Sequence, residues 1–543
     1  MCIRDRAMSD GGRRRISPAE LAPLATIASV ALVLRLVGLG AESLWIDESW
    51  SLWSAEGDLA TLLEMTRRDV HPPLYYLALH VWILAAGIGE AALRLPSALL
   101  STAGVLMTWV LGRRLVGRWA ALVGAAALAV SPFQIQYAQE ARSYALLLLL
   151  ALVSMWFLLS LLTRSSLWQR LGWLVTMTLL LYCHYTALLL WACHNLLFAI
   201  GFLGRREPNA APGAVSAPTT GAQWLGLQLA CVVLWLPGAT LMLEQKYGAP
   251  EDFWLPAMSW GAVLDLIGLL VGLAAPPGVA PATWHAVAAL GGLILLGLTA
   301  VAFSRYGRLL IEPAAEEETP SGRDDALATW MRRWTLGVWL IGPGVLAAML
   351  SWFGVELFTV RNLVWVAPAF TLTVAGVARR VSQPSLRALV VALLLAIPAA
   401  SLPDYYTAVR KEQWRAAGNL ARSSWRDGDA AVVDAWFARR CFEYYLGRSI
   451  DPLDIFADPL DETTRVWLVR SHSRDRARLI PRVLIKGGLH RRSTHRFFGV
   501  GLELYVRAQP GDGTRAQSPP GAGPEVRVVV RSRSEVSPTP STP

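Results

Sequence analysis

Long apolar runs separated by short polar segments set the pattern of this sequence. Most runs are about 20 residues long, the length that an α-helix needs to cross the hydrocarbon core of a bilayer. Helices are the expected form, because they satisfy their own backbone hydrogen bonds and the alternating pattern of a membrane β-barrel does not occur. We predict about eleven transmembrane helices, at residues 21–39, 95–111, 119–135, 146–162, 171–182, 187–202, 224–243, 286–303, 335–353, 363–377 and 386–403.

Two further apolar runs, at residues 74–87 and 262–275, are too short for a full span. We expect them to form helices at the membrane interface, the second of them alternatively a re-entrant segment. The stretch at 58–68 is amphipathic with a helical period and belongs to the loop before the first of these runs.

The pattern changes after residue 403, where apolar runs shorten to strand length and charge density rises. Strand-like stretches at 430–436 and 464–471, together with the helical pattern at 412–425, predict a small α/β domain over residues 404–508. Residues 509–543 are rich in Pro, Gly, Ser and Arg, and we predict that they are disordered.

Composition and charge fit a multi-pass membrane protein. The chain is 54% hydrophobic and 17% charged, and its net charge of +10 comes largely from Arg clusters between apolar runs, which argues against nucleic-acid binding. Arg13, Arg14 and Arg15 predict that the basic tail 1–19 is cytoplasmic, and residues 1–10, which lack the apolar core of a signal peptide, look extraneous. An odd number of spans places residues 404–508 outside the cell (inner) membrane.

The five cysteines are scattered, and their spacing indicates neither a disulfide framework nor a zinc site.

Candidate chemistry begins directly after the first span, where WIDESWSLW places Asp47 and Glu48 among three tryptophans. Trp is enriched at the membrane–water boundary, and a carboxylate there escapes most of the cost of burial in hydrocarbon. This pattern predicts a pair of acids at the mouth of a membrane-embedded cavity. The alternative is that both acids end a helix and stay solvated. The predicted topology puts YAQEARSY, which carries Glu140 and Arg142, on the same external face.

Three external stretches carry a resemblance to a known family: WIDESWSLW, HPPLYY followed by LRLPS, and SPFQIQYAQEARSYAL. Together they resemble the membrane glycosyltransferases of the family 39 type, in the GT-C superfamily that includes protein O-mannosyltransferases and the aminoarabinose transferase of lipid A. The resemblance covers residues 21–185 in motif and order, and more loosely the whole membrane part with its external domain. It implies a GT-C-like catalytic domain over residues 20–403 that inverts a sugar as it leaves a polyprenyl phosphate donor for a lipid, glycan or protein acceptor.

Displacing a lipid phosphate from a sugar needs a carboxylate to take the proton of the acceptor hydroxyl, and cations to stabilise the departing phosphate. The resemblance implies that Asp47 is this base and that Glu48 positions Asp47 or the sugar, although either acid could serve. It gives Glu140 a supporting role in acceptor or sugar binding, the alternative being an ion pair with Arg142 alone. Arg142 and Arg361 are the candidates for the phosphate, because a guanidinium can hold two phosphate oxygens. A topological anchor is the alternative for Arg142.

Two residues of HPPLYY are further candidates for substrate binding. Pro72 and Pro73 fix the chain at the helix start, so the ring of His71 should point at a defined spot near the acids. It either hydrogen-bonds substrate or caps the helix. Tyr76 is expected to pack on sugar or lipid, like three other tyrosines of these stretches, unless interfacial anchoring alone explains them. These three are Tyr75, Tyr137 and Tyr144.

Two alternatives concern the class of site. Asp47, Glu48 and Glu140 could hold a divalent cation, but the resemblance to enzymes with a monophosphate donor argues against an obligate metal, and no other cofactor is implied. A transporter or flippase for a lipid-linked sugar would also carry charges along its path. The acids cluster at one face rather than at the midplane, and inverted repeats of broken helices do not occur, so the glycosyltransferase is favoured.

Overall fold

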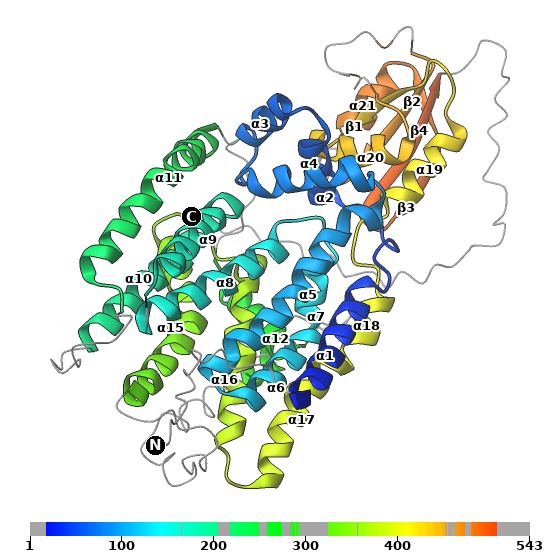
Figure 1. Ribbon diagram of the computed structural model, residues 1–543. Coiled ribbons are helices and arrows are strands. Elements are labelled where there is room, and N and C mark those ends of the chain that lie inside the picture. Colours follow the sequence, from blue (N-terminus) through cyan, green and yellow to red (C-terminus); the bar gives the residue numbers. More distant parts are fainter. Residues whose placement is uncertain are drawn as a thin grey trace, which may run out of the picture.

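The computed structural model consists of a large helical body and a small sheet domain at one end of it (Figure 1). It describes residues 18–248, 258–273 and 324–507, except 164, 205–217, 356, 451–452, 454–459, 461–462 and 473–478, and a few positions between 283 and 293. The predicted tails at 1–19 and 509–543 and most of the predicted span at 286–303 therefore lie outside the described residues.

The helical body contains the long apolar helices and the shorter ones that connect them. Its helices are α1 (Pro18–Leu36), α2 (Ile46–Glu56), α3 (Leu59–Arg67), α4 (Leu74–Ala86), α5 (Glu90–Leu115), α6 (Arg118–Ala129), α7 (Pro132–Ala138), α8 (Tyr144–Thr163), α9 (Leu167–Cys183), α10 (Ala187–Gly204), α11 (Gly221–Gly248), α12 (Trp260–Val271), α15 (Asp324–Trp352), η1 (Arg361–Val366), α16 (Ala367–Arg380), α17 (Pro384–Ala400) and α18 (Leu402–Thr407). Seven of the described segments are long and apolar enough to cross a membrane, or eight if the bent pair α6 and α7 is one span. A multi-pass helical membrane protein is therefore confirmed, whereas the count of eleven spans stays a prediction.

The predicted span at 119–135 is bent, because the chain breaks within it. Helix α6 ends at Ala129, and α7 begins at Pro132 after a bend of 61°. Proline has no backbone N–H and clashes with a preceding helical turn, but it fits the first turn of a new helix. The break turns α7 away from the axis of α6 and leads the chain into the loop that carries Glu140 and Arg142.

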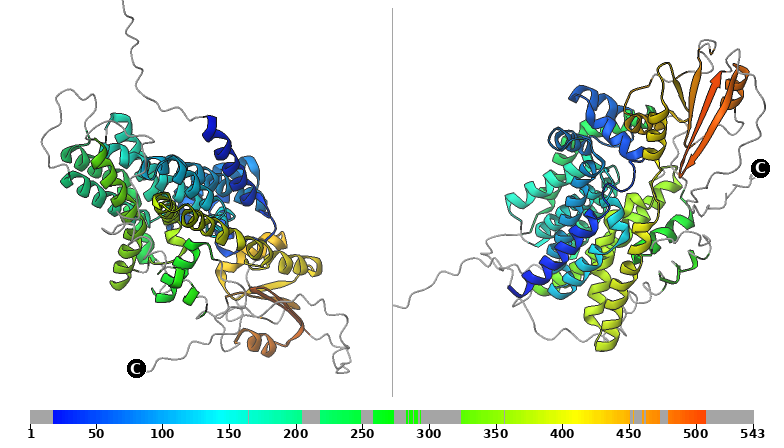
Figure 2. Two further views of the ribbon diagram at one scale, coloured as in Figure 1. Left: turned by 90° about the horizontal axis from the view of Figure 1, so that it is seen from below. Right: turned by 90° about the vertical axis from the view of Figure 1, so that its right-hand side faces the viewer.

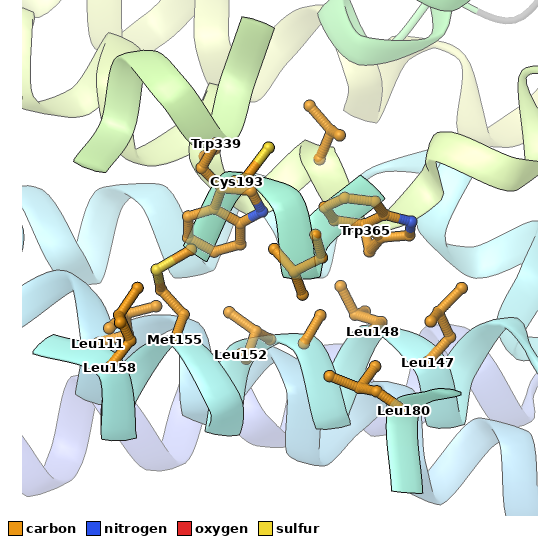
Figure 3. Packing of buried hydrophobic residues seen from close by; sticks show 14 of the residues in the cluster. Leu111, Leu147, Leu148, Leu152, Met155, Leu158, Leu180, Cys193, Trp339 and Trp365 are labelled. Carbon is orange, nitrogen blue, oxygen red and sulfur yellow. The ribbon is translucent and has the colours of Figure 1, made fainter. Parts of the chain in front are cut away.

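Close packing holds the helical body together. Figure 3 shows the buried side chains of α8, such as Leu152 and Met155, beneath Cys193 of α10 and Trp339 of α15. At another contact, a Cβ added to Gly112 of α5 would lie 2.6 Å from Leu372 of α16. Small residues bring helices this close in a membrane, where packing rather than the hydrophobic effect drives their association.

The sheet domain has four strands in the order β1-β2-β4-β3. Strand β1 pairs parallel with β2, and β4 pairs antiparallel with both β2 and β3. The elements are α19 (Trp414–Ser424), β1 (Ala430–Val433), η2 (Trp436–Ala438), α20 (Arg439–Leu446), β2 (Arg465–Arg470), α21 (Leu479–Lys486), β3 (Leu489–Phe497) and β4 (Val500–Arg507). Side chains alternate along β2, so Trp467 packs with α19 and α20 while Leu468 packs with α21 on the other face.

The sheet domain docks on the segment that carries the candidate acids, at the junction seen in the two views of Figure 2. The hydroxyl of Tyr445 donates to Glu90 at 2.6 Å, and Arg415 pairs with the same carboxylate at 2.7 Å. On α2 itself, the hydroxyl of Ser49 lies 2.8 Å from the thiol of Cys441 on α20. These contacts hold the starts of α2 and α5 against the sheet domain.

Candidate active site

The two acids of WIDESW lie in the first turn of α2, where the helix dipole favours negative charge. Successive helix positions point about 100° apart. The side chain of Asp47 is 19% exposed, whereas that of Glu48 is fully buried. The two carboxylates therefore have separate surroundings.

Glu48 is held between two cations. The Nε and Nη2 atoms of Arg94 each donate a hydrogen bond of 2.7 Å to its carboxylate. This is the bidentate geometry typical of arginine–carboxylate pairs. Lys411 donates from 3.1 Å, and the backbone N–H of Ala141 from 2.9 Å. Burial raises the pKa of Glu48, but the charges of Lys411 and Arg94 outweigh it and hold this pKa at about 2. Both oxygens are thus engaged, which favours the positioning role predicted for Glu48 over a direct one.

Asp47 faces two arginines from distant parts of the chain. Its Oδ2 atom accepts a hydrogen bond of 2.9 Å from Nη1 of Arg361, which is the first residue of η1. Arg142 donates to the backbone carbonyl of Asp47 at 3.3 Å and to the hydroxyl of Ser51 at 3.2 Å. The predicted base and the two predicted phosphate ligands, Arg142 and Arg361, are therefore brought together.

His71 completes this group from the loop before α4. Its Nε2 lies 3.1 Å from Arg142 Nη2, and since arginine can only donate, this nitrogen accepts. The proton then sits on Nδ1, which lies 3.5 Å from a carboxylate oxygen of Asp69. Burial and the charge of Arg142 lower the pKa of His71, so its ring is neutral at pH 7. Both ring nitrogens are thus engaged, and the neutral ring is placed to orient the guanidinium of Arg142.

Tyr76 does not face an open space, and its predicted contact with substrate is replaced by a supporting role. Its side chain is 1% exposed, and its hydroxyl donates to Asp69. Asp69 in turn faces His71. Tyr76 is therefore placed to orient these two residues.

Glu140 lines the same cavity as Arg94 and Lys411, the two cations that pair with Glu48. It is 4% exposed and forms no ion pair with Arg142 among the described residues, where its Oε2 atom also lacks a hydrogen-bond partner. Burial raises the pKa of Glu140 to about 7. The cavity has a volume of about 130 Å³ and is also lined by Gln136 and Arg410. The geometry thus favours a binding role for Glu140 over the alternative of an ion pair with Arg142 alone.

Three residues of this region were not predicted as site residues. Arg94 is the arginine of LRLPS, near the start of an apolar run, and an arginine at such a position was a usable signal. Asp69 stands two residues before His71, which was a weaker one. Lys411 reaches Glu48 across 363 positions in sequence, so no local pattern indicated it.

No metal site forms here among the residues that the structure describes, since none of their His, Cys, Asp and Glu side chains gather in groups of three or more that could hold an ion. Asp47 and Glu48 are instead paired with arginines.

Comparison with protein families gives one match. Residues 70–217 match the family described as dolichyl-phosphate-mannose-protein mannosyltransferase, which covers about a quarter of the chain. This part includes His71, Glu140 and Arg142, but not Asp47 or Arg361. Comparison with curated proteins gives no match.

Several solved structures are similar over much of the chain. Apo ArnT from Cupriavidus metallidurans has a TM-score of 0.45 and 16% identity, over 90% of this chain and 98% of that one. The oligosaccharyltransferase AglB from Archaeoglobus fulgidus, in complex with an inhibitory peptide and a dolichol-phosphate, has a TM-score of 0.47 and 12% identity, over 83% and 69%. The Pmt1-Pmt2 complex of S. cerevisiae, bound to the sugar donor, has a TM-score of 0.32 and 19% identity, over 43% and 34%.

Structural similarities of this size do not establish a function. The family match is the stronger finding, and it agrees with the motifs HPPLYY and YAQEARSY. The predicted resemblance to membrane glycosyltransferases of the family 39 type is thereby confirmed over residues 70–217, the part of the chain that matches the dolichyl-phosphate-mannose-protein mannosyltransferases.

Proposed function

We propose that this protein is a membrane glycosyltransferase that moves a hexosyl or pentosyl group from a polyprenyl phosphate to an acceptor hydroxyl. The observation that carries the proposal is the meeting of Asp47 with Arg361, 314 positions away, and with Arg142, 95 positions away. One acid beside two guanidinium groups is the set that this displacement needs.

In the proposed reaction, Asp47 takes the proton of the acceptor hydroxyl as that oxygen attacks the anomeric carbon. The bond from this carbon to the phosphate oxygen breaks on the opposite face, and its electron pair leaves with the polyprenyl phosphate. The anomeric centre is therefore inverted. Arg142 and Arg361 offset the charge that grows on the leaving phosphate.

The ion pair between Asp47 and Arg361 serves both roles in this scheme. Before donor binds, Arg361 holds the carboxylate of Asp47 in place at a distance of 2.9 Å. When the phosphate enters, Arg361 shares its N–H groups between the two anions, because a guanidinium has five donors. His71 accepts from Arg142 and so fixes the direction of its remaining N–H groups.

We further propose that the reaction takes place on the extracytoplasmic side of the cell (inner) membrane, with eleven spans, a cytoplasmic N-terminus and an external domain at 404–508. Support comes from the helices that lead away from the site. Helix α5 carries Arg94, the partner of Glu48, in its first turns and has Arg113 and Arg114 in its last turn, and α16 likewise ends with Arg379 and Arg380. Cations gathered at the end away from the site are expected on the cytoplasmic side.

The test is sugar transfer by the purified protein in lipid nanodiscs. Polyprenyl-phosphate-linked hexoses and pentoses are supplied with extracts of envelope lipids, glycans and proteins, and release of polyprenyl phosphate is followed. Asp47→Asn keeps the shape of the side chain but cannot take a proton, so transfer should fall by at least about 10² while donor binding survives.

Glu56→Gln is the matched control, because Glu56 is an exposed acid at the other end of α2. It should transfer sugar as the unmodified protein does. Near-normal transfer by Asp47→Asn would remove Asp47 from the role of base, and movement of labelled lipid across vesicles without any transfer would instead favour a flippase.

A further inference from the structure

A row of aromatic side chains runs from Asp47 to the sheet domain. Trp50 follows Asp47 by three positions on α2, so both lie on one side of that helix. The ring centroids of Trp50 and Trp53 are 5.1 Å apart, and those of Trp50 and Trp436 are 6.0 Å apart. Trp436 starts η2, three positions after β1 ends at Val433, and is 64% exposed. Phe437 continues the row toward the end of β2.

This row passes along the carboxyl ends of the two parallel strands. Asp434 follows β1, and His472 follows β2 by two positions. Ligands of open α/β sheets bind at this edge, where backbone and loop groups converge. The pKa of His472 is raised, mainly by its hydrogen bond with Glu412, although burial opposes this shift. The charge of Asp47 also raises this pKa, so Asp47 lies within electrostatic reach of this edge.

Two polar atoms beside the aromatic rings have open hydrogen-bonding capacity. Oδ2 of Asp434 and Nε1 of Trp50 are both buried and lack a partner in the described part of the chain. One accepts and the other donates. The nearby cation is engaged, since the Arg440 guanidinium lies 4.4 Å from the Trp53 ring and pairs with Glu443 at 3.0 Å.

A saccharide matches this combination. The C–H faces of a sugar ring pack on flat aromatic surfaces, and its hydroxyl groups can both donate to Asp434 and accept from Trp50. An extended peptide would instead pair with the outer edge of β1. That edge is already in use, because the N–H of Leu453 donates to the carbonyl of Ala431 at 3.1 Å.

We propose that Trp50, Trp436 and Asp434 form an acceptor site for the end of a glycan, which holds a sugar hydroxyl beside Asp47. The inference rests on the proposed function, because it assigns the acceptor of that reaction. It makes the sheet domain part of the substrate site, with α2 contributing the base and the first aromatic ring.

The test measures saccharide binding without any donor. The full chain in nanodiscs is titrated with soluble tetrasaccharides of glucose, mannose, galactose and N-acetylglucosamine, and binding is detected by saturation-transfer NMR. At least one of them should bind, and Trp436→Ala and Asp434→Asn should each weaken its affinity at least about tenfold. Trp436→Phe, which keeps a ring, should restore much of the loss.

Trp168→Ala is the matched control, because Trp168 is 71% exposed but stands at the start of α9, the end away from His184 and the site. It should bind like the unmodified protein, and thermal unfolding shows whether each variant is folded. Absence of binding by all four tetrasaccharides would overturn the proposal, as would equal binding by Trp436→Ala and Asp434→Asn.

Failure of this inference is distinguishable from failure of the proposed function. Binding of a serine- and threonine-rich peptide that Trp436→Ala abolishes, without saccharide binding, would overturn the glycan site and leave transfer to a protein intact. Conversely, saccharide binding that persists in a protein without transferase activity would leave the site and remove the reaction.

Discussion

Asp47 and Glu48 are neighbours on α2 with the same charge, but Asp47 is partly exposed with one ion-pair partner, while Glu48 is buried between two. Because adjacent helix positions diverge by about 100°, one acid turns toward Arg361 and the other toward Arg94. The partner of Asp47 can be shared with an incoming anion. The partners of Glu48 join α2 to α5, to the loop at Ala141 and to the sheet domain. A two-acid motif can thus hold one reactive group and one anchor.

The largest expected effect comes from removing the anchor. Glu48→Gln keeps the shape but leaves Arg94 and Lys411 buried without their counter-charge, which costs about 3–5 kcal/mol. The midpoint of thermal unfolding in detergent should fall by many degrees, whereas Asp47→Asn, at a partly exposed pair that can keep a hydrogen bond to Arg361, should change it less. Glu56→Gln serves again as the control. If Glu48→Gln unfolded at the same midpoint as the unmodified protein, Glu48 would not be a stabilising anchor, and the contrast with Asp47 would be wrong.

A pH-dependent effect is expected at Glu140, the third acid. Its pKa in the folded protein is about 7, above its ordinary value of 4.5, because burial disfavours the charged form. The neutral form therefore contributes stability below pH 4.5, and this contribution is lost as pH rises through 7. Glu140→Gln is neutral at every pH. Its free energy of unfolding, relative to that of the unmodified protein, should therefore rise by up to about 3 kcal/mol between pH 5 and pH 8.

The measurement is the difference in unfolding midpoint between Glu140→Gln and the unmodified protein at pH 5, 6, 7 and 8. That difference should grow with pH, while the same difference for Glu56→Gln should stay constant. A constant difference for Glu140→Gln as well would show that Glu140 is charged in the folded state, like Glu48.

Much of the helical body could be predicted because its signal is local. An apolar run of membrane length specifies a helix wherever it occurs, and α8 and α10 match the predicted spans closely. The break at Pro132 was available from the same sequence, but the surrounding apolar run concealed it. Strands β3 and β4 were not predicted. Strand β3 is an Arg-rich edge strand with little alternation, and its pairing with β4 depends on contacts between segments.

The candidate site likewise contains residues that a local motif indicates and contacts that depend on distant segments. Asp47, His71 and Arg142 stand in motifs, so their chemistry could be predicted before their geometry was known. The anchoring of Glu48 could not, because Lys411 and Arg94 reach it from other elements. Tyr76 was predicted as a binding residue from its place in HPPLYY, but a tyrosine can serve equally well as a buried hydrogen-bond donor, and the sequence does not distinguish the two.

The smallest expected effect concerns Tyr76, which supports the Asp47 side through Asp69 and His71. Tyr76→Phe removes one hydrogen bond to a buried carboxylate and leaves the packing intact. The loss lowers the free energy of unfolding by about 1.5–3 kcal/mol. Asp69 then holds His71 less firmly, and Arg142 loses part of its orientation. Donor binding should weaken about two- to fivefold in a polyprenyl phosphate titration, with maximal turnover little changed. Tyr247→Phe, at an exposed tyrosine on α11, is the matched control. If Tyr76→Phe lowered turnover as strongly as Asp47→Asn, Tyr76 would contact the reacting groups itself, and its predicted role as a substrate ligand would return.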